Sequence, residues 1–412
     1  MIERRSDPGA PGTKRRREAS LEGWVLPTSI MVLLGGLPMS AALSQKPPSS
    51  SQSTIENRKS TILGWPMHRG NPQLTGVATS DLPEKLEVRW KFETEEPFTG
   101  SAAIVDGTVY VGAEDATFYA FDLADGKKRW SFAAGGPIQS TPLVEGKLVI
   151  FGDDKGDVHA LDAKTGTNVW NFHTEGEIVS ATNHTDGRIV FGSYDGSIYC
   201  LSVADGKLLW KYATEGKVHG TPSIVEGHVL AAGCDEGFHV IDQATGELKR
   251  RVPLGSVSGS SAAARGSRAY VGTYGNQVRC IDWKSGETVW TFEDSERQFP
   301  FVSSAAVTEE IVIIGGRDKR LRGFDTATGK VRWTFSTEAR IDSSAVIVGK
   351  RAFVGSSDGN LYSVDVSSGK ELWRFSTGSP ISASPAVAEG ALVMGTQDGV
   401  LYCFAAKGKG DS

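Results

Sequence analysis

Residues 361–373 read LYSVDVSSGKELW, and variants of this stretch recur along the chain. The tryptophan that ends the stretch returns at intervals of about 40 residues. The positions that hold it are Trp90, Trp130, Trp170, Trp210, Trp290, Trp333 and Trp373, and Arg250 takes the place between Trp210 and Trp290. A period in this range indicates an array built from one repeated supersecondary unit.

A tight turn precedes each of these positions after Trp90. In the quoted stretch it runs from Asp365 to Gly369, and each of these repeats keeps the glycine four residues before the tryptophan position. Asp can hydrogen-bond its own backbone two residues on, and Gly can take a positive φ, so both suit a sharp reversal. The flanking runs, such as residues 197–201 and 208–212, are rich in aliphatic and aromatic residues and predict a hairpin. A second hairpin upstream, with a Glu-Gly or Asp-Gly turn, brings each repeat to four short strands.

Four strands cannot bury both faces of their own sheet, so neighbouring units must stack. A ring of units leaves only short, protected edges, which is the arrangement of a β-propeller. Residues 86–92 supply one outer strand without its partners, and residues 385–404 supply three strands without the fourth. We therefore predict an all-β, eight-bladed propeller of four-stranded antiparallel blades. The N-terminal strand should close the ring by joining the C-terminal blade.

The quoted stretch resembles the tryptophan-docking repeat of pyrroloquinoline-quinone (PQQ) propellers, and the likeness extends over roughly residues 61–405. Residues 64–77, which read GWPMHRGNPQLTGV, resemble the lead-in of bacterial PQQ-like repeat proteins of the BamB type. The resemblance implies that the repeat tryptophans are structural residues packed between blades. Arg250 departs from this pattern, so we expect a looser blade junction there.

The N-terminal part differs in character from the repeats. Residues 1–18 are rich in Arg and Lys, residues 24–43 carry no charge, and small residues follow at 42 and 44. This order is typical of a signal peptide, and an uncleaved membrane anchor at residues 1–44 is the alternative. Residues 45–60, rich in Ser, Gln and Pro, are interpreted as a disordered linker. A propeller at residues 61–407 and a tail at 408–412 follow, and both alternatives place the propeller in the periplasm or otherwise outside the cytoplasm.

The net charge bears on the binding partners, and the positions of the cysteines bear on disulfide formation. The net charge of −5, without a basic stripe in the repeats, argues against nucleic-acid binding. Cys200, Cys280 and Cys403 hold the same slot on the third strand of different repeats, which separates them widely. We expect them and Cys234 to be unpaired thiols, even though export would permit disulfides.

A PQQ-dependent quinoprotein oxidoreductase is the catalytic alternative. Members of that class clamp the quinone with a calcium ion and typically a disulfide between adjacent cysteines, and they carry long insertions between blades. This chain has no adjacent cysteines, and its repeats are almost evenly spaced. We therefore expect no catalytic, cofactor-binding or metal-binding residues, and neither PQQ nor calcium. The acidic run at residues 153–157 lacks the alternating order and the bidentate Glu of a calcium loop, and we interpret it as a solvated turn.

Two surfaces are candidates for binding. The innermost strands should start around the mouth of the central channel, with Gln139, His219 and Asp342 as the polar members and Arg340 beside them. The full slot contains Thr99, Gln139, Val179, His219, Ser258, Val302, Asp342 and Ser382. The irregular loop at residues 293–300 should expose Arg297 and Phe299, and such residues are enriched in protein-binding hot spots.

The resemblance implies a non-catalytic scaffold of the cell envelope, similar to the outer-membrane assembly factor of this family. Envelope proteins, including an outer-membrane assembly machine, are then the expected partners of a monomeric propeller, and the N-terminus offers a means of membrane association. A propeller that senses a ligand and signals to a partner is a further alternative, because one blade construction serves many functions.

Overall fold

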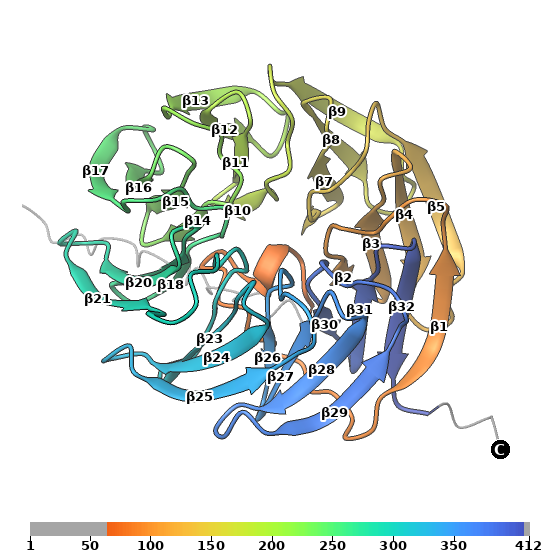
Figure 1. The fold of residues 1–412 in the computed structure, drawn as a ribbon. Helices are drawn as coiled ribbons and strands as arrows, with labels where there is room; N and C mark the ends of the chain where they lie inside the picture. Colours follow the sequence, from red (N-terminus) through yellow and green to blue (C-terminus); the bar gives the residue numbers. More distant parts are fainter. Residues whose placement is uncertain (1–63, 408–412) are drawn as a thin grey trace, which may run out of the picture. The chain divides into compact units, whose positions relative to one another are not determined.

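The computed structural model describes residues 64–407, which form a ring of eight four-stranded sheets (Figure 1). All strand pairs within the sheets are antiparallel. The prediction of an all-β, eight-bladed propeller is confirmed. Between residues 64 and 407 the structure has one helix, the single 3₁₀ turn η1 (His68–Gly70).

Each blade runs from a short inner strand to a longer outer strand. The first four blades are β2 (Ala103–Val105), β3 (Thr108–Gly112), β4 (Thr117–Asp122) and β5 (Lys128–Ala133); β6 (Leu143–Glu145), β7 (Leu148–Gly152), β8 (Asp157–Asp162) and β9 (Asn168–His173); β10 (Asn183–Thr185), β11 (Arg188–Ser193), β12 (Ser197–Ser202) and β13 (Leu208–Ala213); and β14 (Ser223–Val225), β15 (His228–Ala232), β16 (Gly237–Asp242) and β17 (Leu248–Pro253).

The other four blades repeat this plan. They are β18 (Ala263–Arg265), β19 (Arg268–Gly272), β20 (Gln277–Asp282) and β21 (Thr288–Glu293); β22 (Ala306–Val307), β23 (Ile311–Gly315), β24 (Arg320–Asp325) and β25 (Val331–Ser336); β26 (Val346–Val348), β27 (Arg351–Gly355), β28 (Asn360–Asp365) and β29 (Glu371–Ser376); and β30 (Ala386–Ala388), β31 (Ala391–Gly395), β32 (Val400–Ala405) and β1 (Glu87–Glu93).

The last blade closes the ring. Strand β1 pairs antiparallel with β32, and Trp90 lies opposite Cys403. The two ends of the propeller therefore share one sheet, as predicted from the two incomplete repeats. The pairing ties down both ends, which would otherwise fray.

A repeat tryptophan joins one blade to the next at six of the eight junctions. Trp170 shows the arrangement: its indole Nε1–H donates to the carbonyl of Val203 at 3.0 Å, and its ring lies against Gly206 of the next blade. Five other indoles make the equivalent bond, those of Trp90, Trp130, Trp210, Trp290 and Trp333. Burying the indole with its N–H satisfied stabilises each junction without an unpaired donor.

Arg250 takes the place of a tryptophan without leaving the junction empty. The guanidinium is exposed, yet it lies over Gly286 and donates to the carbonyl of Lys284 at 3.1 Å. Trp283 is only 3% exposed and packs in the apolar core between these two blades. The looser junction expected at Arg250 is therefore not supported, because a neighbouring indole supplies the buried apolar surface.

The four cysteines are unpaired, as expected. Cys200, Cys280 and Cys403 are buried, and burial raises the pKa of each thiol to about 12. They pack as small apolar residues rather than as reactive thiolates.

The predicted signal peptide or anchor at residues 1–44, the linker at 45–60 and the tail at 408–412 lie outside the described residues. Within residues 64–407, the structure contains no helix with the length and apolar character needed to cross a membrane.

Candidate functional site

The lead-in segment at residues 65–80 crosses the centre of the ring and closes one mouth of the channel (Figure 1, orange). It forms hydrogen bonds to the innermost hairpin of every blade, mostly through its backbone carbonyls. The bonds join Trp65 with Ile104, Pro66 with Val144, Pro72 with Asn183 and Ile224, Gln73 with Ala264, Thr75 with Val307, Gly76 and Ala78 with Ile347, and Ser80 with Gly390. The inner strands would otherwise expose unpaired N–H groups to the channel.

Arg69 fixes this segment to the ring. Its guanidinium is 2% exposed and donates to three backbone carbonyls, those of Ser344 at 3.2 Å, Ala305 at 3.1 Å and Ala345 at 2.6 Å. It forms no ion pair with a carboxylate among residues 64–407, and burial lowers its pKa to about 9. Arg69 therefore binds the sixth and seventh blades through charge-assisted hydrogen bonds alone.

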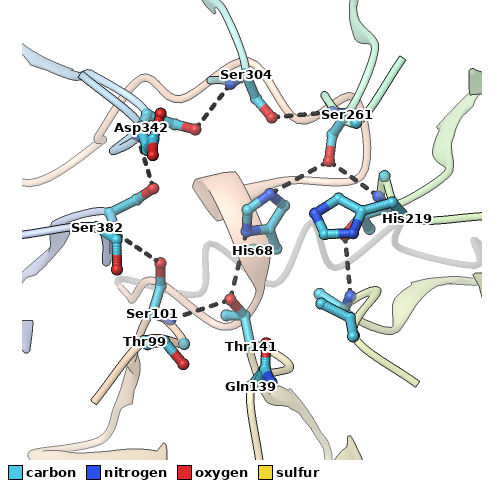
Figure 2. Close-up of a pocket in the computed structure, with 18 of the residues that line it drawn as sticks. His68, Thr99, Ser101, Gln139, Thr141, His219, Ser261, Ser304, Asp342 and Ser382 are labelled. Carbon is cyan, nitrogen blue, oxygen red and sulfur yellow. Dashed lines mark hydrogen bonds between the residues drawn. The ribbon is translucent and has the colours of Figure 1, made fainter. Parts of the chain in front are cut away.

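His68 forms the floor of the pocket that remains open on the other side (Figure 2). Its Nδ1 lies 3.4 Å from Thr141 Oγ1 and its Nε2 lies 3.4 Å from Ser261 Oγ, on opposite sides of the channel. Burial, assisted by the charge of Arg69, lowers the pKa of His68 to about 3. The imidazole is therefore neutral near pH 7.

A ring of hydroxyl groups surrounds His68. In each bond, the backbone N–H of one blade donates to the Ser or Thr hydroxyl at the same place in the next blade. The pairs are Ser101 to Thr141, Ala181 to Thr221, Thr221 to Ser261, Ser261 to Ser304, Ser304 to Ser344, Ser344 to Ser384 and Ser384 to Ser101. Only the step from Thr141 is missing, because Ala181 has no hydroxyl. These bonds hold the inner strands at a constant spacing.

The pocket above His68 has a volume of about 210 Å³. Seven of the eight positions predicted for the channel mouth line it: Thr99, Gln139, Val179, His219, Val302, Asp342 and Ser382. Ser258 was assigned wrongly. It is fully buried and donates to the carbonyl of Gly272 at 2.9 Å, while Gly259 lines the pocket. Counting 40 residues from His219 would have identified Gly259.

A second tier of side chains, which the sequence analysis missed, holds the rim in place. These side chains lie in the turns between the second and third strands and bond to the rim. The pairs are Glu114 with Thr99, Asp154 with Gln139, Tyr194 with His219, Arg317 with Asp342, and Gln397 with Ser382. The signal was available, since these turn residues also recur at the repeat period. The rim is therefore a preorganised polar surface.

The rim carries different charges around its circumference. Burial and the nearby carboxylates of Glu177 and Glu114 raise the pKa of Asp154 to about 6. On the opposite side, Asp342 pairs with Arg317 at 2.8 Å and with Arg340 at 3.0 Å. Arg340 does not line the central pocket. It borders an adjacent groove of about 470 Å³.

The irregular loop lies between β21 and β22, away from the pocket lining. Arg297 is exposed, and the Phe299 side chain is 48% exposed, as the sequence analysis expected. Within the described residues the Arg297 guanidinium forms no ion pair. Both side chains are therefore free to contact another molecule.

The interpretation of residues 153–157 as a solvated turn is wrong for Asp153. Asp153 is fully buried rather than solvated, and its carboxylate lies 2.9 Å from His159 Nε2. It also accepts backbone N–H groups of Lys155 and Asp157. This aspartate is a fixed part of the second blade.

The residues around the channel do not fit the PQQ cofactor of a quinoprotein oxidoreductase. The pocket is smaller than the roughly 300–1,000 Å³ of most ligand sites. Its walls present hydroxyl groups, and the two nearby arginines, Arg317 and Arg340, are already paired with Asp342. The four cysteines include no adjacent pair.

The structure defines a PQQ-like propeller with one closed mouth and a polar open face. The chain matches the family model described as outer membrane protein assembly factor BamB over residues 87–185, 154–252 and 250–409. These matches cover more than half of the 412 residues, so the chain belongs to this family. None of the curated proteins matches the sequence.

Solved structures share the fold at low sequence identity. BamB from Moraxella catarrhalis has a TM-score of 0.67 and 18% identity, covering 78% of this chain and 100% of that one. Quinohemoprotein alcohol dehydrogenase from Comamonas testosteroni has a TM-score of 0.72 and 14% identity, covering 84% and 81%. The computationally designed Ika8 protein has a TM-score of 0.67 and 16% identity, covering 80% and 99%. At these identities the likeness establishes the fold alone.

Proposed function

We propose that this protein is a non-catalytic scaffold that docks partner proteins in the cell envelope. Membership of the family of an outer-membrane assembly factor supports this function. We further propose that the propeller acts outside the cytoplasm as a monomer and needs neither PQQ nor calcium. Proteins of an outer-membrane assembly machine are the partners that the family suggests.

The observation that carries the proposal is the asymmetry of the two mouths. The lead-in segment bonds to all eight blades and seals one mouth. The other mouth presents a rigid polar rim, and Arg297 and Phe299 are exposed on their own loop. Binding surfaces are commonly built from loops held by a rigid scaffold, and Phe and Arg are effective contact residues.

A quinone-dependent oxidoreductase is the second candidate, because dehydrogenases with the same fold are known. The small, hydroxyl-lined pocket weighs against it. An absorbance scan of the full chain mixed with PQQ and calcium, followed by a dye-linked alcohol oxidation assay, separates the two. A bound quinone with turnover would reject the scaffold in favour of the enzyme.

Capture of partners from solubilised envelope tests the docking function. The full chain and an Arg297→Ala/Phe299→Ala variant are compared by affinity capture and mass spectrometry. The matched control is Lys370→Ala/Leu372→Ala, which also removes an exposed basic residue and an exposed apolar residue, from the edge of another blade. We expect the control to retain the wild-type partners and the loop variant to lose them. Equal capture by both variants would exclude the loop as the docking surface.

A further inference from the structure

The second blade departs from the repeat at one place. Asp153 and Asp157 occupy slots in which none of the other blades has an acidic residue or a histidine. His173 occupies a slot in which the other blades have Ala, Pro, Ser or Glu. His159 lies on β8 between them. Departures confined to one blade that meet at one place point to a local role, since the fold does not require them.

Three of these side chains bring metal-binding atoms together, and His173 contacts one of the three. His159 Nε2 lies 2.9 Å from Asp153 Oδ2, and His173 Nδ1 lies 2.9 Å from Asp157 Oδ1. One ligand atom from each of Asp153, Asp157 and His159 lies within 4.8 Å of the others. Zinc binds imidazole nitrogen and carboxylate oxygen at about 2.0–2.2 Å, so ligand atoms on one ion lie about 3 Å apart. His173 lies outside this group of three and reaches it through Asp157.

The cluster lacks a basic residue that the next two blades have on their outermost strands. In the third blade, Lys211 pairs with Asp195 at 3.2 Å. In the fourth blade, Arg251 lies 3.7 Å from Asp235. The same slot in the second blade is Asn171.

Neither carboxylate of the second blade therefore has a Lys or Arg partner. Among the described residues, the ion pairs of Asp153 and Asp157 are with His159 and His173 alone. Asp195 and Asp235 stand in the slot of Lys155, so the blades are alike in this region of the sheet and not in the individual carboxylates. A bound cation would supply to Asp153 and Asp157 the charge that Lys211 and Arg251 supply to Asp195 and Asp235. Burying a carboxylate without a cation is costly, which favours uptake of a metal ion.

Backbone hydrogen bonds hold one of the proposed ligands in place, and solvent reaches two others. Asp153 is fully buried, and its Oδ1 accepts the backbone N–H groups of Lys155 at 2.9 Å and Asp157 at 3.0 Å. Such bonds orient a ligating carboxylate. The side chains of Asp157 and His173 are 32% and 59% exposed, so an ion can enter from solvent.

We propose that Asp153, Asp157, His159 and His173 bind one divalent transition-metal ion of the zinc type. Two imidazoles with two carboxylates suit zinc, whereas calcium and magnesium prefer all-oxygen ligand sets. The ion would join β8 to β9 and to the turn before β8. This site is separate from the proposed docking loop and does not depend on the proposed function.

Calorimetric titration of the untagged, chelator-treated full chain with ZnCl₂ tests the site. We expect one ion per chain. Asp157→Asn/His173→Gln should weaken binding at least about tenfold, because even supporting residues of metal sites contribute 10–100-fold. Both side chains are partly exposed, so the variant should keep the fold, which circular dichroism checks.

The matched control is His239→Gln in the fourth blade. His239 also lies 2.9 Å from an aspartate, Asp235, but Arg251 already supplies the cation there. This variant should bind zinc as the wild type does. Failure of the wild type to take up zinc, or equal affinity of Asp157→Asn/His173→Gln and the wild type, would overturn the proposal. Equally tight binding of magnesium would reject the assignment to a zinc-type ion.

Discussion

The contact between tryptophan and glycine at the blade junctions can be tested with one methyl group. Gly206 and Gly187 lie in the same blade and have φ angles of +67° and +71°. A Cβ at Gly206 would lie 2.5 Å from Cε3 of the Trp170 indole, whereas a Cβ at Gly187 would meet nothing within 4 Å. Gly206→Ala and Gly187→Ala are therefore the same change at nearly the same φ, with and without an indole in the way.

The two substitutions should differ in cost. An alanine in the left-handed region costs about 1–2 kcal/mol, and both variants carry this cost. Gly206→Ala must also displace a packed indole, and overpacking of this kind costs about 1–3 kcal/mol. We expect a loss of about 2–5 kcal/mol in the free energy of unfolding for Gly206→Ala and of about 1–2 kcal/mol for Gly187→Ala.

Equilibrium unfolding of the full chain in urea, followed by circular dichroism and by tryptophan fluorescence, measures the difference. The two probes also test whether the ring unfolds in a single step, which repeat proteins do not always do. Equal losses for the two variants would refute the argument. The glycine would then be required for its φ alone, and the indole would not determine the blade junction.

Two further predictions concern the lead-in segment. Arg69→Met should lower the free energy of unfolding by about 3–5 kcal/mol, because three buried carbonyls lose a charged donor and relief of the buried charge offsets only part of this loss. Arg250→Ala, at an exposed site with one such bond, should cost less than about 1 kcal/mol in the same urea titration. Similar losses for the two variants would contradict this explanation. The pKa of His68 is lowered from 6.5 to about 3, so the unfolded chain binds a proton that the folded chain rejects, and stability should fall by up to about 1.4 kcal/mol per pH unit as the pH decreases from 6.5 toward 3. His68→Gln should flatten that part of the stability profile, and an unchanged slope would show that other groups determine it.

The fold could be predicted because every repeat carries the same local information. The turn at Asp365 and Gly369, the alternating strands and the tryptophan each point to the same unit. When the signals agree from residue to residue and from repeat to repeat, one architecture satisfies all of them. The ring closure followed from counting strands, and the pairing of β1 with β32 confirms it.

The floor of the central pocket could not be predicted, because it depends on a segment that belongs to no repeat. The lead-in contains no periodic pattern, so its sequence does not indicate that Arg69 contacts carbonyls more than 230 residues away. The error at Ser258 has a different cause. Ser258 was matched to the other repeats by its residue type, whereas the spacing of 40 residues from His219 leads to Gly259.

The interpretation of residues 153–157 failed because it compared them with known calcium motifs and not with the other blades. In a repeat protein, the other copies are the natural reference: they show that the slot of Asn171 holds Lys211 and Arg251 in the next two blades. In the second blade, carboxylates appear at Asp153 and Asp157, and Lys155 stands where the next two blades have Asp195 and Asp235. The shared fold does not explain this rearrangement of local charge. The same comparison applies to Arg250, where Trp283 of the next blade supplies the apolar surface that the missing indole would have provided. The charge around Asp153 and Asp157 remains unbalanced, whereas the packing at Arg250 is restored. Only the departure in the second blade therefore suggests a ligand.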